Sequence, residues 1–287
     1  MISVVIPALN EEGAIGQTVS AISDTLTKAD LRPFEIIVID DGSGDQTRSE
    51  AEKAGARVIV HMHNLGYGRS IKDGILAANH DTIVIIDADG TYSIGSIPEL
   101  VALYRSGFDM VVAERLGQFY RQSWLKMPMR RLLRFLVEWT TARRVPDVNS
   151  GLRVFSKASV LRYFPHLCDT FSFTTSLTLS YMMNNRFVAY KKTEYYERAG
   201  RSKVRLFRDS MLTLQYIVEA IVYYNPLKIF ILFALLCAAA AFVLLVVALA
   251  FGIVTLALLG VGTSLVSILV VCIGLLAVQL KQIMDKA

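Results

Sequence analysis

The first 114 residues alternate between short β-branched apolar runs and longer stretches whose apolar positions recur at helical spacing. The apolar runs predict strands over residues 2–7, 34–40, 57–61 and 82–87. The stretches between them predict helices near residues 13–28, 46–55 and 67–79. Continuous apolar strands separated by helices are typical of a parallel sheet covered on both faces. We therefore expect an α/β fold with a Rossmann-like, mainly parallel sheet.

The pattern changes near the C-terminus, where residues 229–280 contain no Asp, Glu, Lys or Arg. As a single helix this segment would extend about 78 Å, more than twice the roughly 30 Å hydrocarbon thickness of a bilayer. We expect two transmembrane helices near 229–251 and 258–280, with a turn at Gly252 or around 260–262. A buried helical hairpin in a soluble protein is the alternative.

Two amphipathic segments precede these spans. Residues 123–143 are rich in Trp, Leu and basic residues, which predicts a helix at the membrane interface or, equally, a helix packed on the sheet. Residues 204–226 predict a juxtamembrane amphipathic helix. The chain is expected to divide into a globular domain (1–203), this juxtamembrane helix (204–226) and a transmembrane hairpin (227–287).

Flanking charges predict the orientation in the membrane. Lys228 precedes the first span, and Lys281 and Lys286 follow the second, with no charge between the spans. By the positive-inside rule the globular domain and both termini are expected to be cytoplasmic. Two of the three cysteines lie inside the spans, so no disulfide framework is expected. Small residues at 237–241 permit close helix contacts, including those of a homo-oligomer.

The net charge of +5 conceals a strong asymmetry along the chain. Residues 1–114 carry 8 Lys or Arg against 17 Asp or Glu, whereas residues 115–144 carry 8 against 1. Residues 191–208 are basic again, with 7 against 2. The basic segments lead towards the membrane, so lipid phosphates are the expected anionic partners and no nucleic-acid partner is expected.

Acidic pairs follow three of the predicted strands: Glu11 and Glu12, Asp40 and Asp41, and Asp87 and Asp89. Ligands of parallel sheets bind beyond the carboxyl ends of the strands. Two carboxylates one residue apart repel each other, and a divalent cation that also binds ligand phosphates relieves this repulsion. An isolated Asp-x-Asp is weak evidence, because many such carboxylates are simply solvated. His61 and His63 are interpreted as ordinary strand-end residues, since no Cys or third His lies nearby to complete a zinc site.

The neighbouring motifs strengthen the case for a cation site. They are "VVIPALNEE" (4–12), "IVIDDGSGDQT" (37–47), "NLGYGRSIKDGI" (64–75) and "DADGT" (87–91). In this order they resemble the family 2 glycosyltransferases of the GT-A fold. The later "DVNSGLRVF" (147–155) and "RAGRSK" (198–203), with the two spans, resemble the polyprenyl-phosphate glycosyltransferases, including dolichyl-phosphate mannose synthase.

The resemblance implies a site for a nucleotide-sugar donor with Mg²⁺ or Mn²⁺. The residues it assigns to the donor are Pro7, Leu9, Glu11, Val38, Asp40, Asn64, Gly66, Asp87 and Ala88. Those it assigns to the metal are Asp87, Asp89 and Thr91. Leu9 and Thr91 depart from the family pattern, which often has an aromatic residue and Gln there. A turn with a helix cap remains the alternative for Asp41, and a helix entry for Asn64 and Gly66.

The resemblance also implies a polyprenyl-phosphate acceptor held by cations. Predicted catalytic residues are Asp89, Arg115, Arg130, Arg131, Arg198 and Lys203. Predicted acceptor-binding residues are Asp147, Asn149, Ser150 and Arg201. Binding of lipid headgroups without chemistry is the alternative for juxtamembrane cations, and a plain turn for residues 147–150.

The predicted function is an inverting, metal-dependent transfer of a hexose from a UDP- or GDP-linked donor to a membrane polyprenyl phosphate. A lipid phosphate is already ionised at neutral pH, so the acceptor needs no general base. Two alternatives remain: a membrane polysaccharide synthase, which usually has more spans, and a non-catalytic module that binds nucleotide sugars.

Overall fold

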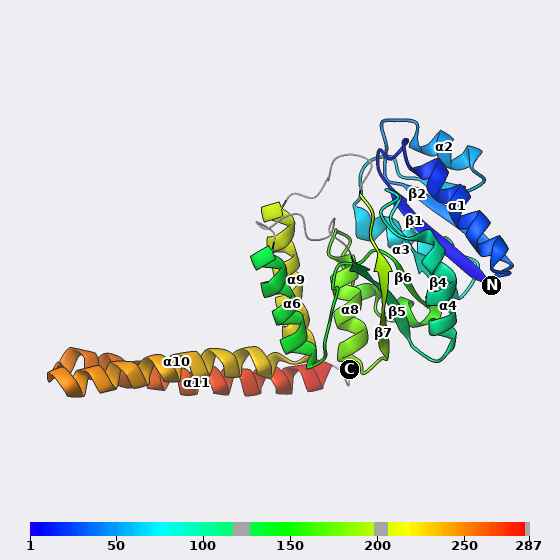
Figure 1. Ribbon diagram of the computed structural model, residues 1–287. Helices are drawn as coiled ribbons and strands as arrows, with labels where there is room; N and C mark the ends of the chain where they lie inside the picture. Colours follow the sequence, from blue (N-terminus) through cyan, green and yellow to red (C-terminus); the bar gives the residue numbers. More distant parts are fainter. Residues whose placement is uncertain (117–126, 198–205, 285–287) are drawn as a thin grey trace. The chain divides into compact units, whose positions relative to one another are not determined.

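The computed structural model describes residues 1–116, 127–197 and 206–284 (Figure 1). The chain forms two compact units, Met1–Ile217 and Val218–Ala287. The finer division predicted from the sequence, at residues 203 and 226, stays a prediction.

The first unit is built on a seven-stranded sheet of order β3-β2-β1-β4-β6-β5-β7. The strands are β1 (Ile2–Ala8), β2 (Phe34–Asp40), β3 (Arg57–Val60), β4 (Thr82–Ile85), β5 (Met110–Leu116), β6 (Arg153–Ser156) and β7 (Val188–Glu194). Neighbouring strands are parallel except β6, which is antiparallel to β4 and β5. The predicted α/β fold with a mainly parallel sheet is confirmed.

Helices cover both faces of this sheet (Figure 1). They are α1 (Ile15–Lys28), α2 (Thr47–Lys53), α3 (Tyr67–Ala77), α4 (Ile97–Arg105), α7 (Lys157–Leu161) and α8 (Phe173–Met183). Helix α6 (Met127–Thr141) packs on α8, and α9 (Leu206–Tyr224) crosses the boundary between the two units. One core joins Val19 of α1 and Leu100 of α4 to one face of the sheet. A second core joins Ile71 of α3 and Phe173 of α8 to the other face. The central strands β1, β2 and β4 are mainly apolar on both sides because helices cover both faces of the sheet there.

The direction of β6 determines what lies at the carboxyl edge of the sheet. β1 and β2 are in register, with Ala8 opposite Asp40, so their carboxyl ends lie side by side. β6 pairs with β4 in the opposite sense, with Arg153 opposite Ile85. The loop that precedes β6 therefore reaches the same edge as the residues that follow β4, which brings residues 147–151 to Asp87.

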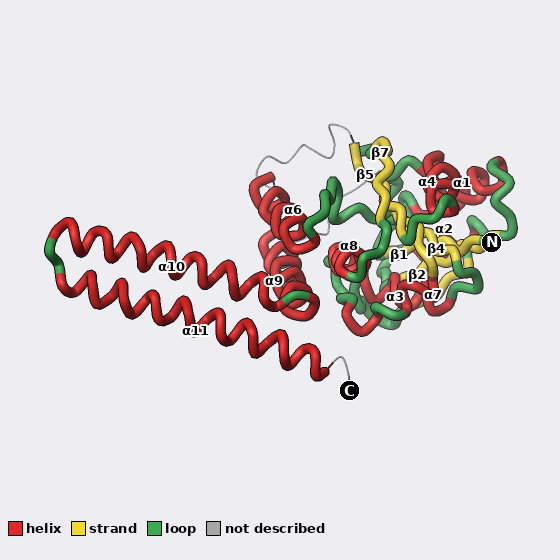
Figure 2. The backbone as a smooth tube through the Cα atoms, turned by 90° about the horizontal axis from the view of Figure 1, so that it is seen from below, coloured by secondary structure: helices red, strands yellow, loops and turns green. Residues whose placement is uncertain are grey.

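The second unit contains α10 (Pro226–Phe251) and α11 (Val254–Met284), which run side by side (Figure 2). Both helices are long and apolar enough to cross a membrane. Large apolar side chains such as Phe242 and Leu249 are 68% and 86% exposed, so this chain does not bury them, against the alternative of a buried hairpin. The helix pair supplies the apolar surface that a bilayer would cover.

The turn between these helices differs from part of the prediction. Gly252 adopts a left-handed conformation with φ of 69° and ends α10, as predicted. The second helix, however, begins at Val254 rather than near 258, and Gly260 and Gly262 lie inside it. A Cβ at Gly260 would lie 2.7 Å from Leu245 Cγ, so this glycine permits close helix packing rather than a turn.

The predicted interfacial helix corresponds to α6, which contacts α8 in the globular unit. Residues 117–126 lie outside the described part of the chain. Phe135 of α6 is 61% exposed, so the helix combines a packed side with an exposed aromatic residue. Contact with a membrane stays a prediction.

Candidate active site

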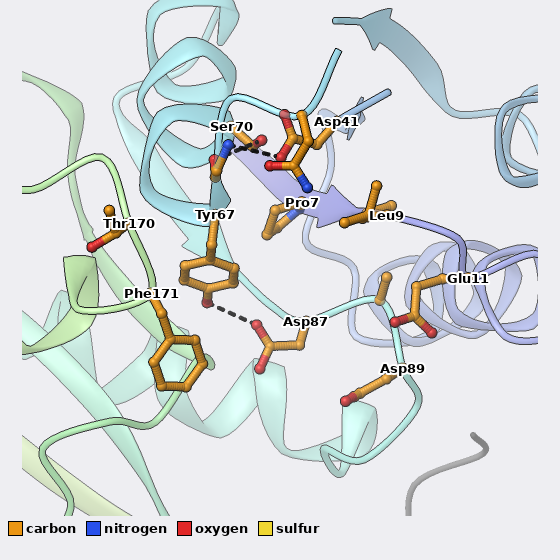
Figure 3. A pocket seen from close by; sticks show the side chains of 14 residues that line it. Pro7, Leu9, Glu11, Asp41, Tyr67, Ser70, Asp87, Asp89, Thr170 and Phe171 are labelled. Atoms are coloured by element: carbon orange, nitrogen blue, oxygen red, sulfur yellow. Dashed lines mark hydrogen bonds between the residues drawn. The ribbon is translucent and has the colours of Figure 1, made fainter. Parts of the chain in front are cut away.

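A pocket of about 280 Å³ opens beyond the carboxyl ends of β1 and β4 (Figure 3). It lies between the loop after β1, the start of α3, the turn after β4 and the segment before α8. Its lining comprises Pro7, Ala8, Leu9, Glu11, Asp41, Asn64, Gly66, Tyr67, Ser70, Asp87, Ala88, Asp89, Thr170 and Phe171. The carboxylates that follow three separate strands thus line one cavity, as the topology of parallel sheets requires.

Most residues predicted to bind the nucleotide sugar line this pocket. They are Pro7, Leu9, Glu11, Asn64, Gly66, Asp87 and Ala88. Val38 is buried in the core instead. Asp40 is buried outside the lining, where its Oδ1 accepts a hydrogen bond of 2.9 Å from the Ser43 amide. The neighbouring Asp41, for which a turn was the equal alternative, is the carboxylate that reaches the pocket. The functional roles of these residues stay predictions.

The two carboxylates of the Asp-x-Asp motif are held in different ways. The Tyr67 hydroxyl donates a hydrogen bond of 2.7 Å to Asp87 Oδ1. Asp89 Oδ1 accepts hydrogen bonds from the Thr91 hydroxyl at 2.7 Å and the Thr91 amide at 3.2 Å. Asp89 is only 7% exposed, and Thr91 is fully buried beneath it. Thr91, a predicted metal ligand, supports Asp89 and does not line the pocket.

The absence of a side chain at Gly151 makes room for the Asp87 carboxylate. A Cβ at this position would lie 2.4 Å from Asp87 Oδ2, closer than real contacts allow. The Gly151 amide donates to the Tyr92 hydroxyl at 2.5 Å, which holds the loop in place. Any side chain at position 151 would therefore displace the Asp87 carboxylate.

These residues fit a hard divalent cation. Asp87 and Asp89 supply carboxylate oxygens to one cavity, and Glu11 lines it as well. Among the described residues there is no group of three or more His, Cys, Asp or Glu side chains that would hold a metal by itself. Mg²⁺ typically binds one or two carboxylates and completes its coordination with ligand phosphates and water, so a dedicated protein cage is not required.

A buried charge cluster beside the pocket was missed at the sequence level. The two ring nitrogens of His61 face Asp41 Oδ1 at 2.8 Å and Asp73 Oδ2 at 3.1 Å. Asp41 also accepts the amide hydrogens of Leu65 and Gly66, at 2.8 and 2.9 Å. Asp41 therefore shapes the loop that forms one wall of the pocket. His61 lies at the end of β3 as predicted, and its contacts with two carboxylates are an addition that the sequence did not indicate. The sequence gave no signal of this cluster, because Asp73 lies on α3 whereas His61 follows β3.

The wall formed by Thr170 and Phe171 is fastened to α3. Lys72 binds the Asp169 carboxylate at 2.7 Å and also donates to the Leu167 carbonyl. A Cβ at Gly68 would collide with the Cys168 carbonyl, so α3 and this segment touch backbone to backbone. The sequence contains no local signal for this contact between residues about a hundred positions apart.

Arg115 and Asp147 form a buried ion pair near the pocket. Arg115 Nε and Nη2 donate to the two carboxylate oxygens of Asp147 at 2.7 and 2.8 Å. Burial alone would raise the pKa of Asp147, but the charge and hydrogen bonds of Arg115 outweigh it and lower that pKa below its ordinary value. The predicted roles of Arg115 in catalysis and of Asp147 in acceptor binding stay predictions. The contacts show in addition that Arg115 and Asp147 hold each other in place.

Arg153, which was not predicted, organises the loop that carries Asp147. It is fully buried and donates to the carbonyls of Ser150 and Val148 and to the Thr178 hydroxyl, at 2.7 to 2.8 Å. Desolvation by this burial lowers the pKa of Arg153. The rest of the predicted acceptor site is only partly described. Asn149 accepts from Thr175, the Ser150 hydroxyl is buried, and Arg131 is exposed on α6. Arg198, Arg201, Lys203 and the side chain of Arg130 lie outside the described residues.

Asp147→Asn is expected to lower the free energy of unfolding at neutral pH by about 3 kcal/mol, because it removes the negative charge that faces the largely buried Arg115. The folded-state pKa of Asp147 is depressed, so its contribution is present above the unfolded value of about 3.9 and is lost as pH falls through the folded value. Denaturant unfolding at several pH values measures this. The difference between wild type and variant should persist at pH 5 to 7 and shrink in more acidic solution.

Glu99→Gln is the matched control, since it breaks the exposed pair of Glu99 with Lys191. It should cost less than about 1 kcal/mol. Equal costs for the two variants would contradict the buried, charge-dependent role of Asp147.

Comparison with known proteins now places the chain in a family. Residues 3–164 match glycosyl transferase family 2, which is more than half of the chain. The chain belongs to glycosyl transferase family 2. The Asp-x-Asp pocket at the carboxyl edge is thus the candidate active site of a glycosyltransferase, and the sequence-based prediction of this enzyme class is confirmed.

Curated relatives of this family 2 chain include lipid-phosphate sugar transferases. An undecaprenyl-phosphate 4-deoxy-4-formamido-L-arabinose transferase of Edwardsiella ictaluri is 29% identical, covering 79% of this chain and 69% of the relative. A dolichyl-phosphate hexose transferase of Haloferax volcanii is 29% identical, covering 72% of this chain and 87% of the relative. These names support the resemblance to the polyprenyl-phosphate glycosyltransferases.

Solved structures agree on the fold. Glucosyl-3-phosphoglycerate synthase from Mycobacterium tuberculosis, in complex with Mn²⁺, UDP-glucose and phosphoglyceric acid, superposes with a TM-score of 0.63. The two are 22% identical, with 77% of this chain and 79% of the other covered. At this identity the likeness concerns the fold.

Proposed function

We propose that this family 2 glycosyltransferase transfers a hexose from a nucleotide sugar to a membrane polyprenyl phosphate, with inversion at the anomeric carbon. The observation that carries the proposal is the pairing of Asp87 and Asp89 in one pocket of a chain with two membrane-length helices. The names of the Edwardsiella and Haloferax relatives support the lipid-phosphate acceptor.

The donor would occupy the pocket, with its diphosphate towards Asp87 and Asp89. Because the N-terminal 114 residues are acidic, a nucleoside diphosphate needs a divalent cation to bind there. Mg²⁺ or Mn²⁺ held by these carboxylates would neutralise the charge that develops on the leaving diphosphate. Solved structures of a distant neighbour with Mn²⁺ and with Mg²⁺, both with UDP, support this choice of cations.

The acceptor phosphate would attack the anomeric carbon directly as the bond to the nucleoside diphosphate breaks. The phosphate is already ionised, so no side chain has to remove a proton. The protein has to position two anions, the acceptor phosphate and the donor diphosphate, side by side, and this requires cationic groups. Arg115, Arg130, Arg131, Arg198, Arg201 and Lys203 are the proposed set. The pocket and both chain termini would face the cytoplasm, as the flanking lysines predict.

Transfer of radiolabelled sugar tests the proposal. Purified full-length protein is incubated with Mn²⁺, undecaprenyl or dolichyl phosphate, and UDP- or GDP-linked hexoses, with and without EDTA. Label that enters organic solvent and is lost with EDTA is the expected result. Label in insoluble polymer would point instead to a polysaccharide synthase. No transfer with any donor would point to a module that only binds nucleotide sugars.

A further inference from the structure

We infer that Tyr67 is a positioning residue for the Asp87 carboxylate and thereby sets how tightly the pocket binds a divalent cation with a nucleoside diphosphate. This inference rests on the proposed function. Tyr67 was absent from the sequence-based site, although Asn64 and Gly66 of the same motif were assigned to the donor.

The geometry of the pocket carries the inference. The Tyr67 hydroxyl and Asp87 Oδ1 are 2.7 Å apart, and Figure 3 shows the phenol ring reaching from the start of α3 to Asp87. On the other side, Gly151 stands where any Cβ would lie 2.4 Å from Asp87 Oδ2. Asp87 is therefore confined between a hydrogen-bond donor and a backbone surface, which restricts its rotamer.

The position of Tyr67 is itself fixed by packing. Gly66, with φ of 107°, turns the chain into α3, and its missing Cβ makes room for the Asp169 carbonyl. The Phe171 ring lies 6.1 Å from the Tyr67 ring, tilted by 49°. Lys72 ties the segment before Phe171 to α3 through Asp169. The backbone turn at Gly66 and the ring contact with Phe171 thus fix the position of the phenol independently of its hydroxyl.

The chemistry of the hydrogen bond fits a positioning role. A phenol carries its proton at neutral pH, so the Tyr67 hydroxyl donates its hydrogen to the Asp87 carboxylate. A donor at Oδ1 fixes the orientation of the carboxylate plane, and this orientation determines how Asp87 can bind a cation in the pocket. Asp89 is oriented separately by Thr91, so the two carboxylates have independent supports.

Tyr67→Phe tests the inference, since it keeps the ring and its contact with Phe171 and removes only the hydroxyl. Mn²⁺ binding to the full-length protein, in the presence of UDP or of GDP, is followed by electron paramagnetic resonance or calorimetry. We expect the apparent affinity for Mn²⁺ to fall about tenfold or more, in line with the loss of a hydrogen bond to a charged group. In transfer assays, raising the Mn²⁺ concentration should restore most of the turnover.

Tyr104→Phe is the matched control, because it removes a half-buried hydroxyl on α4 away from the pocket. It should leave Mn²⁺ affinity and turnover unchanged. If wild type binds Mn²⁺ with a nucleotide and Tyr67→Phe binds it equally well, Tyr67 has no positioning role. If Tyr67→Phe loses activity that no Mn²⁺ concentration restores, the hydroxyl acts on a step other than cation binding, and the inference is also overturned. If wild type itself binds no Mn²⁺ with either nucleotide, the proposed function and this inference fall together.

Discussion

Asp89→Ala is expected to lower the rate of sugar transfer by about 10²–10³-fold or more, the scale seen when one charge-stabilising group is removed from an active site. Asp89 is almost fully buried and lines the pocket, so its charge is not replaced by solvent. The fold should survive, because no described strand or helix depends on the carboxylate. Initial rates of label transfer at saturating donor, together with the melting temperature, measure both effects.

Asp89→Asn separates the effect of the negative charge of Asp89 from the effect of its hydrogen bond with Thr91. The amide keeps the size of the side chain and an oxygen for the Thr91 hydroxyl, but it lacks the negative charge. If the charge is what matters, Asn should lose nearly as much activity as Ala. Asp24→Ala, on the exposed side of α1, is the control and should be neutral. Full activity of Asp89→Asn would show that this position only supports the turn.

Gly151→Ala is expected to be nearly as damaging, although it adds only one methyl group. The new Cβ would overlap the Asp87 carboxylate, which must then move by an ångström or more. A displacement of that size at a reacting centre costs on the order of 10²-fold in rate. Transfer rates and the apparent affinity for Mn²⁺ with UDP or GDP should both fall, and additional Mn²⁺ should restore little of the rate because the carboxylate is displaced.

Gly95→Ala provides the comparison for this substitution, because a Cβ at Gly95 meets nothing within 4 Å. It should be active and stable. Since overpacking can also destabilise a protein by about 1–3 kcal/mol, the melting temperature is needed to separate the two effects. An active, cation-binding Gly151→Ala protein would contradict the tight confinement of Asp87.

Much of the fold could be predicted from local patterns. β2 covers residues 34–40 in both the prediction and the structure, because a buried parallel strand requires an unbroken apolar run. The boundaries of α3 and α2 shifted by one or two residues, where helix ends are decided by single hydrogen bonds. The start of α11 was misplaced because glycines suggest a turn by composition, whereas Gly260 and Gly274 are explained by contact with α10.

The sequence by itself determined where the carboxylates stand. Asp87 and Asp89 follow an apolar strand, and parallel strands deliver such residues to one edge whatever the rest of the chain does. The sequence also determined that residues 229–280 need an apolar environment, because a run of this length without a charged residue is too apolar to be exposed to water.

Only the tertiary structure decided which side chains act on those carboxylates. Tyr67 and Gly151 reach Asp87 from positions 20 residues before it and 64 residues after it, the second through the reversed direction of β6. His61 lies between Asp41 and Asp73 in the same way. Periodicity describes the environment of a residue along its own element, whereas these contacts depend on the packing of separate elements, which no local pattern encodes.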